Sequence, residues 1–289
     1  MPDLRDLIEA RAYRPEAVAE AAARRTRRPL LGQNGRLFVI AADHPARGAL
    51  GVGDRALAMA NRFDLLERIC IALSRPGVDG VLGTADLIED LLLLGVLDGK
   101  VVIGSMNRGG LAGAAFELDD RFTAYDARTL HAMGFDGGKM LLRIDPADPG
   151  SLATLEACAH AVSELAAHRL MAMVEPFMSY RAKDGRVRND LSPQAMMRAI
   201  AIASGLGNTS AYTWLKVPVV ADMERVMESS TLPALLLGGD LGRDPDVIFS
   251  RWRKALQLPT VRGLVAGRAL LYPPDDDVAA AVDTAVSLL

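Results

Sequence analysis

The sequence is poor in the residues that mark several common classes of protein. Its two cysteines, Cys70 and Cys158, lie in apolar helical patterns, which indicates reduced core thiols in a cytoplasmic protein rather than a disulfide framework. The four histidines are scattered, and no Cys-x-x-Cys or His-x-x-His pair is present, so no metal site or metal cofactor is expected. The run of leucines at Leu91–Leu94 is far too short to span a membrane.

The chain also carries no large excess of positive or negative charge. The net charge of −3 gives no attraction toward nucleic acid or an anionic membrane, so neither is an expected partner. With 50% apolar and 24% charged residues, the chain has ample material for a globular core. No repeat or low-complexity linker divides it, so we expect one domain over residues 1–289, with residues 1–30 as a helical extension. The sequence is compatible with a homo-oligomer but does not determine the oligomeric state.

Eight short apolar runs alternate with longer amphipathic segments along the chain. The runs are Leu37–Asp43, Gly80–Gly83, Val101–Gly104, Lys139–Ile144, Leu170–Glu175, Thr213–Val217, Ala234–Leu237 and Gly263–Ala266. The helical segments include residues 54–72 and 119–133. Strands that alternate with helices pair in parallel, and eight such units in about 250 residues are typical of a (β/α)8 TIM barrel. A doubly wound sheet is the alternative, but the first strand lacks its usual Gly-x-Gly-x-x-Gly turn.

Four of the predicted strands can aim a charged side chain at one cavity. In a TIM barrel the active site lies at the C-terminal ends of the strands. Because side chains alternate along a strand, Asp43, Lys139, Glu175 and Lys216 can all reach that end of the barrel on one face of their strands. Four such residues on four strands predict a shared catalytic site.

The last two predicted strands end in glycines. The seventh is followed by Gly238 and Gly239, and the eighth by Gly267 and Arg268. Glycines let backbone N–H groups turn toward an anion, and an arginine adds a charged fork. Since the loops after strands seven and eight are the usual phosphate site of this fold, these four residues predict a phosphorylated small-molecule substrate. Tight turns alone are the plainer interpretation of the glycines.

Lys216 lies in an apolar run of β-forming residues, and lysine is scarce in this chain, with five lysines among 33 basic residues. Burying an unpaired ammonium group is costly, so such a group tends to lose its proton. A fall of about three units from the ordinary lysine pKa of about 10.4 corresponds to roughly 4 kcal/mol. A neutral buried amine is a nucleophile that forms Schiff bases with carbonyl compounds.

These motifs together resemble the class I aldolases of the barrel type, namely the tagatose-bisphosphate, sulfofructose-phosphate and DhnA-like fructose-bisphosphate aldolases. The matching segments are Ala41–Gly48, Lys139–Pro146, Val174–Pro176, Leu215–Pro218 and Gly267–Arg268, and the resemblance covers about residues 35–272. The first segment carries two inserted residues. Two departures concern the substrate more than the reaction: Gly238-Gly-Asp240 stands where the families usually have a serine before the glycine, and the residues after Lys216 differ.

The resemblance implies that Lys216 forms an iminium with a phosphorylated keto-sugar or keto-sugar acid. The adjacent C–C bond then breaks, and dihydroxyacetone phosphate and an aldehyde are released. Glu175 is the expected general acid and base, and Asp43 binds a substrate hydroxyl or takes its proton. Lys139, as a second cation, would lower the pKa of Lys216. No cofactor is needed.

Each of these residues also has a purely structural interpretation. Lys216 could bind phosphate or serve only the fold. The other three would have local partners: Lys139 with Asp136 or Asp145, Glu175 with Tyr180 or Arg181, and Asp43 with the turn that follows it. His44 is expected to be a loop residue without a catalytic part.

Two rival functions stay open on the sequence alone. A phosphate-binding isomerase or epimerase would use Glu175 and Asp43 for proton transfer and would form no Schiff base. A regulatory protein that binds a sugar phosphate would use the barrel without catalysis. The aldehyde product is also open, although the arginines at 47, 108, 143 and 181 favour an acidic or doubly phosphorylated substrate.

Overall fold

The computed structural model describes residues 5–238 and 245–289, and its centre is a closed barrel of eight parallel strands. These are β1 (Leu37–Ala41), β2 (Gly80–Gly83), β3 (Val101–Ser105), β4 (Gly137–Ile144), β5 (Met171–Arg181), β7 (Thr213–Val217), β8 (Ala234–Leu237) and β9 (Val261–Ala266). Neighbours in the chain pair with each other, and β1 pairs with β9. The predicted (β/α)8 barrel is therefore confirmed.

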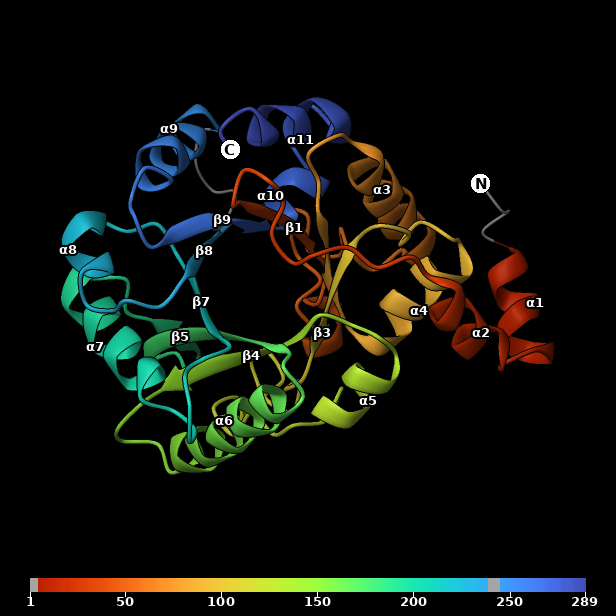
Figure 1. Ribbon diagram of the computed structural model, residues 1–289. Coiled ribbons are helices and arrows are strands. Elements are labelled where there is room, and N and C mark those ends of the chain that lie inside the picture. The colour runs from red at the N-terminus through yellow and green to blue at the C-terminus, as the bar shows by residue number, and fades with distance from the viewer. Residues whose placement is uncertain (1–4, 239–244) are drawn as a thin grey trace.

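Helices form an outer ring around the barrel, as the view along its axis in Figure 1 shows. They are α3 (Arg62–Ser74), α4 (Ala85–Leu93), α5 (Ala127–Ala132), α6 (Gly150–Ala167), α7 (Pro193–Ser204), α8 (Met223–Met227), α9 (Pro245–Ala255), α10 (Arg268–Leu271) and α11 (Val278–Val286), with a 3₁₀ turn, η1, at Pro45–Arg47. Within residues 5–238 and 245–289, no helix is both long and apolar enough to cross a membrane.

The strands bury both of their faces, in two separate apolar clusters. On β1, Leu37, Val39 and Ala41 point into the barrel, whereas Phe38 and Ile40 pack outward under the helices. The interior cluster also contains Leu82, Val101, Ile103, Met171, Met173, Leu235 and Val265. Because of this alternation, a residue two positions after the last interior apolar residue, such as Asp43 after Ala41 or Glu175 after Met173, faces the upper end of the barrel.

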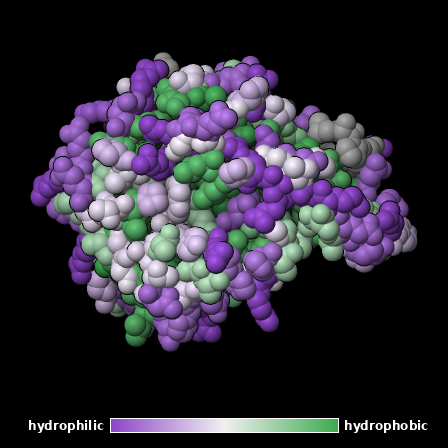
Figure 2. Space-filling view, in the orientation of Figure 1, coloured by the Kyte–Doolittle hydropathy of each residue, from purple (hydrophilic) through white to green (hydrophobic). Residues whose placement is uncertain are grey.

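The N-terminal segment lies outside the ring and also closes the lower end of the barrel. Helices α1 (Asp6–Tyr13) and α2 (Ala17–Arg24) lie beside α4 in Figure 1, and Figure 2 shows this projection as largely hydrophilic. Farther along the chain, Leu30 and Leu31 pack against the interior cluster from below. Arg25 is buried there and donates hydrogen bonds to the carbonyl oxygens of neighbouring loops.

Two helices begin later than the sequence pattern indicated. Residues 54–61 and 119–126 form turns and loops, and α3 and α5 start at residues 62 and 127. A side-chain cap stands at each start: the Asn61 side chain accepts from two backbone N–H groups of α3, and Asp126 accepts from the N–H of Thr129. Caps of this kind satisfy the free donors of the first turn and so define where a helix begins.

Strand β5 runs six residues beyond its predicted end at Glu175 and forms a hairpin with the short strand β6 (Val187–Asn189). A proline, Pro176, lies within the strand, which normally argues against strand structure. Pro176 is tolerated because β7 pairs with β5 only as far as Val174. On the β7 side of β5, no strand is therefore left without a hydrogen bond from the N–H that proline lacks. The hairpin brings Phe177 and Asn189 to the upper end of the barrel.

We expect Gly263→Ala to destabilise the barrel by about 2 kcal/mol or more, as overpacking of a close contact does. Gly263 in β9 has φ +141°, and a Cβ there would collide with the carbonyl oxygen of Leu37 on β1. The control is Gly205→Ala at the end of α7, where the nearest atom would be 3.7 Å from the new Cβ. Urea unfolding followed by circular dichroism measures both; equal stabilities would contradict the expectation.

Candidate active site

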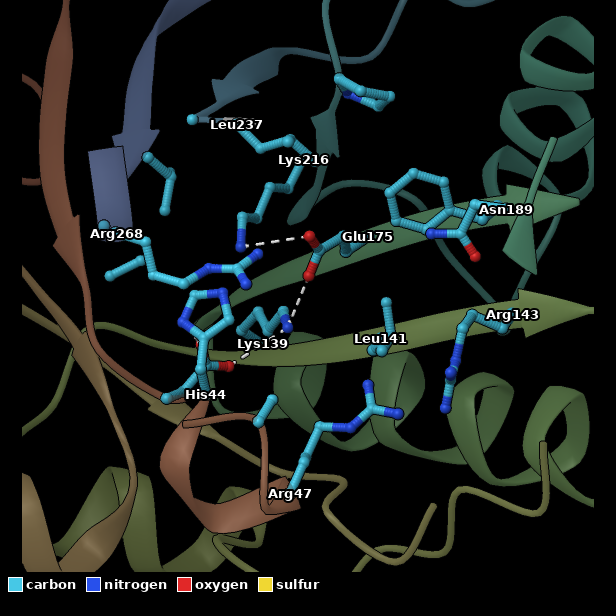
Figure 3. A pocket seen from close by; sticks show the side chains of 18 of the residues that line it. His44, Arg47, Lys139, Leu141, Arg143, Glu175, Asn189, Lys216, Leu237 and Arg268 are labelled. Carbon is cyan, nitrogen blue, oxygen red and sulfur yellow. Dashed lines mark hydrogen bonds and ion pairs between the residues drawn. The ribbon is translucent and has the colours of Figure 1, made fainter. Parts of the chain in front are cut away.

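A cavity of about 360 Å³ opens at the C-terminal ends of the strands (Figure 3). It is lined by all four expected catalytic residues and by three of the four expected phosphate-binding residues: Asp43, Lys139, Glu175, Lys216, Gly238, Gly267 and Arg268. The fourth, Gly239, lies outside the described residues. The structure thus brings together the side chains that the strand alternation placed on one face.

The four ionisable side chains form a continuous chain of contacts across the cavity. The Lys216 Nζ lies 3.3 Å from Oε1 of Glu175, and the Lys139 Nζ lies 2.6 Å from Oε2 of the same carboxylate. Lys139 also reaches Oδ2 of Asp43 at 3.2 Å. Glu175 therefore stands between two lysines, as Figure 3 shows, and Lys139 contacts two carboxylates.

These contacts replace the local pairings that the sequence left open for Lys139, Glu175 and Asp43. The carboxylate of Asp136 accepts instead from the backbone N–H of Val102, at the opposite end of β4. Asp43 accepts from Ser105 Oγ at 3.2 Å and ion-pairs with Arg108, rather than capping the following turn.

Burial removes the solvent that would otherwise screen this cluster. Lys216 is 3% exposed, Lys139 and Asp43 are 2% exposed, and Glu175 is 9% exposed. Burial lowers the pKa of Lys216 and lowers that of Lys139 well below its ordinary value. The charge of Arg108 lowers the pKa of both lysines further, Arg268 adds to this at Lys216, and Glu175 raises the pKa of both. Although burial favours its neutral acid, Lys139 and Lys216 hold the pKa of Glu175 well below its ordinary range.

The charges around Glu175 balance only when one amine is neutral. Three buried cations, Arg108, Lys139 and Lys216, face two carboxylates, Asp43 and Glu175. Burial lowers the pKa of Arg108 to about 10, which leaves it charged at neutral pH. Since Lys139 contacts both carboxylates and Lys216 contacts one, the geometry favours Lys216 as the amine that gives up its proton.

The structure adds His44 to the cavity, where the sequence indicated only a loop residue. In Figure 3 its ring lies between Arg268 and Lys139. Burial and the nearby charges of Arg268, Lys216 and Lys139 lower the pKa of His44 well below its ordinary value, so the ring is neutral. His44 precedes η1, and a strand pattern carries no information about the direction of such a turn. In the sequence, only the position of His44 directly after Asp43 could have indicated that it lies in the cavity.

The opposite wall of the cavity is built from the ends of β8 and β9. A Cβ on Gly238 would lie 3.5 Å from the backbone nitrogen of Gly267, so the two glycines are neighbours. A Cβ on Gly267 would collide with the carbonyl oxygen of Ala41, which makes glycine a requirement of barrel closure there. Arg268 lines the cavity beside them and forms no ion pair with any residue in the described part of the chain. A guanidinium without a protein partner is suited to an anionic ligand.

Comparison with known proteins gives one family and one fold. A family model described as Cgl0159-like matches residues 35–286. The crystal structure of Cgl0159 from Corynebacterium glutamicum is 58% identical, with 100% of this chain and 97% of that chain covered and a TM-score of 0.96. No curated protein matches the sequence.

More distant structures share the fold. A Schiff-base-forming fructose-1,6-bisphosphate aldolase is 17% identical, with 94% of this chain and 99% of that chain covered and a TM-score of 0.65. The fructose-bisphosphate aldolase from Slackia heliotrinireducens is 15% identical, with 97% and 90% covered and a TM-score of 0.62. At such identities the similarity establishes the barrel architecture.

We expect Glu175→Gln to lower the free energy of unfolding by about 3–5 kcal/mol at pH 7, the usual cost of removing one partner of a buried ion pair. The pKa of Glu175 is depressed in the folded state. Its stabilisation is therefore fully present above its unfolded pKa of about 4.3 and is lost as the pH falls below that value.

Urea unfolding at pH 7, 5, 4 and 3 should show the difference between wild type and Glu175→Gln shrinking below about pH 4. The control is Glu156→Gln, which changes an exposed residue on α6. A difference that stays constant with pH would show that Glu175 does not draw its stability from being ionised.

Proposed function

The chain belongs to the Cgl0159-like family, and we propose that it is a class I aldolase that cleaves a phosphorylated keto-sugar or keto-sugar acid through a Schiff base on Lys216. The observation that carries the proposal is the buried Lys216 amine, in contact with Glu175 at the catalytic end of a TIM barrel. Structures of this fold include an archaeal fructose-1,6-bisphosphate aldolase with its catalytic lysine bound to the carbinolamine intermediate, which supports the same chemistry here.

The proposed reaction begins with attack of the neutral Lys216 amine on the ketone carbon of the substrate. The resulting carbinolamine loses its oxygen as water, for which Glu175 relays the protons, and an iminium remains. The electrons of the adjacent C–C bond then move to the iminium nitrogen while a base takes the proton of the neighbouring hydroxyl. An aldehyde leaves, the enamine is protonated on carbon, and water releases dihydroxyacetone phosphate and the free amine.

Each neighbour of Lys216 has a definite part in this scheme. Lys139 holds the Glu175 carboxylate in place and keeps it ionised, and together with Arg108 it balances the charge of Asp43. Asp43 is the nearest carboxylate for a substrate hydroxyl on the side of Lys139. Arg268 and the backbone at Gly238 and Gly267 would bind the phosphate, as would Gly239, which is outside the described residues. Such a grip orients the carbonyl carbon toward the amine.

An isomerase or epimerase without a Schiff base is less well supported. Such an enzyme needs a carboxylate with a raised pKa to act as its base at neutral pH. The two lysines instead lower the pKa of Glu175, which weakens it as a base before substrate binds. Conversion of the neutral Lys216 amine to an iminium instead creates a positive charge on the substrate itself, where it can act as an electron sink.

We expect the protein to be cytoplasmic and to act on a small molecule. Cys70 and Cys158 are both buried and free, which supports the proposal of a cytoplasmic protein. The expected partner is a small phosphorylated molecule, bound without a cofactor or a metal. Within the described residues no group of three or more metal-binding side chains is present.

Borohydride reduction in the presence of dihydroxyacetone phosphate should produce a stable adduct on Lys216, identified by peptide mass spectrometry. Lys216→Ala and Lys216→Arg should give no adduct, because the first removes the amine and the second keeps the charge without the nucleophile. Lys139→Met is the matched variant: its adduct should form more slowly but still on Lys216. An adduct on Lys139, or aldolase activity that survives in Lys216→Ala, would refute the proposal.

The rate of trapping with unphosphorylated dihydroxyacetone should rise with pH through a midpoint below about 10.4, the ordinary lysine value. The charge of Arg268 lowers the pKa of Lys216, so Arg268→Met should move the midpoint upward. The control Arg186→Met changes an exposed arginine of the β5–β6 hairpin and should leave the midpoint in place. A downward shift in Arg268→Met would contradict the expected sign.

A further inference from the structure

The cavity extends beyond the lysines to a second group of basic residues. Arg143 follows Lys139 on the inward face of β4, and Arg47 lies in η1. Figure 3 shows Arg268 on one side of the Lys216–Glu175–Lys139 group, and Arg47 and Arg143 on the other. A chain-like substrate held at Arg268 would therefore pass Lys216 and end near Arg47 and Arg143.

The two arginines at this distal end converge on a single carboxylate, that of Glu117. The Arg143 Nη1 donates to Glu117 Oε1 at 2.6 Å, and its Nη2 donates to the Glu117 carbonyl oxygen at 2.6 Å. The Arg47 Nη2 lies 3.9 Å from the same Oε1 and donates instead to the Gly110 carbonyl oxygen at 2.7 Å. Arg143 and Arg47 are 6% and 9% exposed, so these groups are built into the wall of the cavity.

The distal end of the cavity leaves a buried hydrogen-bond donor unused. A guanidinium carries five N–H donors, and the buried Nε of Arg143 has no hydrogen-bond partner in the described part of the chain. The Nε of Arg108, whose guanidinium pairs with Asp43, has none either, and an unpaired acceptor, Asp120 Oδ2, lies behind Arg47. The second oxygen of Glu117 is already occupied, because it accepts from the Gly113 N–H at 2.9 Å. A buried donor without an acceptor is costly, so this end of the cavity is suited to a ligand group that only accepts.

The charges that line the described cavity limit what that group can be. Six cations, Arg47, Arg108, Lys139, Arg143, Lys216 and Arg268, face three carboxylates, Asp43, Glu117 and Glu175. Asp120, which is 1% exposed, lies 3.8 Å from Arg47 behind the lining and is a fourth carboxylate. With Lys216 as an iminium, the six cations exceed the four carboxylates by two positive charges. A phosphate at Arg268 supplies about two negative charges. A carboxylate at the distal end then leaves a single negative charge in the cavity, whereas a second phosphate leaves about two.

We propose that the substrate ends in a carboxylate that binds between Arg47 and Arg143, so that the aldehyde released is an oxo acid. The proposal rests on the proposed aldolase activity and names its substrate class: a phosphorylated keto-sugar acid. The planar carboxylate matches the fork of a guanidinium and accepts from donors that the protein leaves unused. The iminium carbon is bonded to a second carbon, which stays with the enamine. The bond that breaks joins this second carbon to the third, which becomes the aldehyde carbon and lies on the Arg143 side of Lys216.

The experiment runs the reaction in the direction of aldol addition, with dihydroxyacetone phosphate as donor and a panel of acceptor aldehydes. The panel contains glyceraldehyde, glyceraldehyde 3-phosphate, 3-oxopropanoate and 4-oxobutanoate, which end in a hydroxyl, a phosphate or a carboxylate. In the wild type we expect kcat/KM for the better carboxylate-ended aldehyde to exceed that for glyceraldehyde and for glyceraldehyde 3-phosphate by about 30-fold or more, as expected for a charge-assisted pair.

Two variants test whether the arginines cause the preference. Arg143→Lys keeps a positive charge beside Glu117 but loses the fork, and Arg47→Gln removes one charge. In each we expect the preference for the carboxylate to fall by about tenfold or more. Borohydride trapping with dihydroxyacetone phosphate in the same samples normalises for the fraction of competent enzyme. Arg186→Gln, at an exposed position, is the control and should keep the full preference.

The outcomes separate this proposal from the function on which it rests. An adduct on Lys216 together with a preference for the phosphate or hydroxyl end would overturn the carboxylate and leave the aldolase intact. A carboxylate preference that survives in both Arg143→Lys and Arg47→Gln would also overturn the proposed site. Absence of any adduct in the wild type would overturn the aldolase function itself, and the substrate class with it.

Discussion

One carboxylate shared by two buried lysines is the interaction on which this site depends. Lys139, Glu175 and Lys216 come from β4, β5 and β7, which are consecutive in the barrel, so their ends are only a strand's width apart. Two ammonium groups could not be buried this closely without Glu175 between them. The same arrangement leaves the cluster one positive charge in excess, and that excess makes a neutral amine favourable. The structure of the cluster and its proposed reactivity thus have the same electrostatic cause.

The closed barrel makes this concentration of charge possible. Apolar side chains such as Val39 and Met173 fill the interior below the charged groups. The low polarity beneath the site strengthens every contact above it. Because Lys139, Glu175 and Lys216 stand on paired strands, the rigid sheet positions them, and their separations follow from strand register.

Much of the fold was accessible from sequence, since the alternation of strands and helices and the inward parity of Asp43 and Lys216 depend on local patterns. Features that depend on tertiary pairing were not. The continuation of β5 past Pro176 requires knowing where β7 stops pairing, and no local pattern carries that information. The inward direction of His44 is set by η1, a turn that strand periodicity does not describe. The Arg143–Glu117 pair joins residues 26 positions apart and could not be predicted from spacing.

The closure beneath the barrel has a consequence for water. Leu30 and Leu31 pack against the apolar interior from below, and that interior is filled with side chains. In the proposed reaction, water that hydrolyses an imine on Lys216 would therefore arrive through the upper opening, past the β5–β6 hairpin that carries Asn189. Substrate, products and the hydrolytic water would all use this one opening. A ligand that fills the opening would protect the proposed covalent intermediate from hydrolysis until part of the ligand departs.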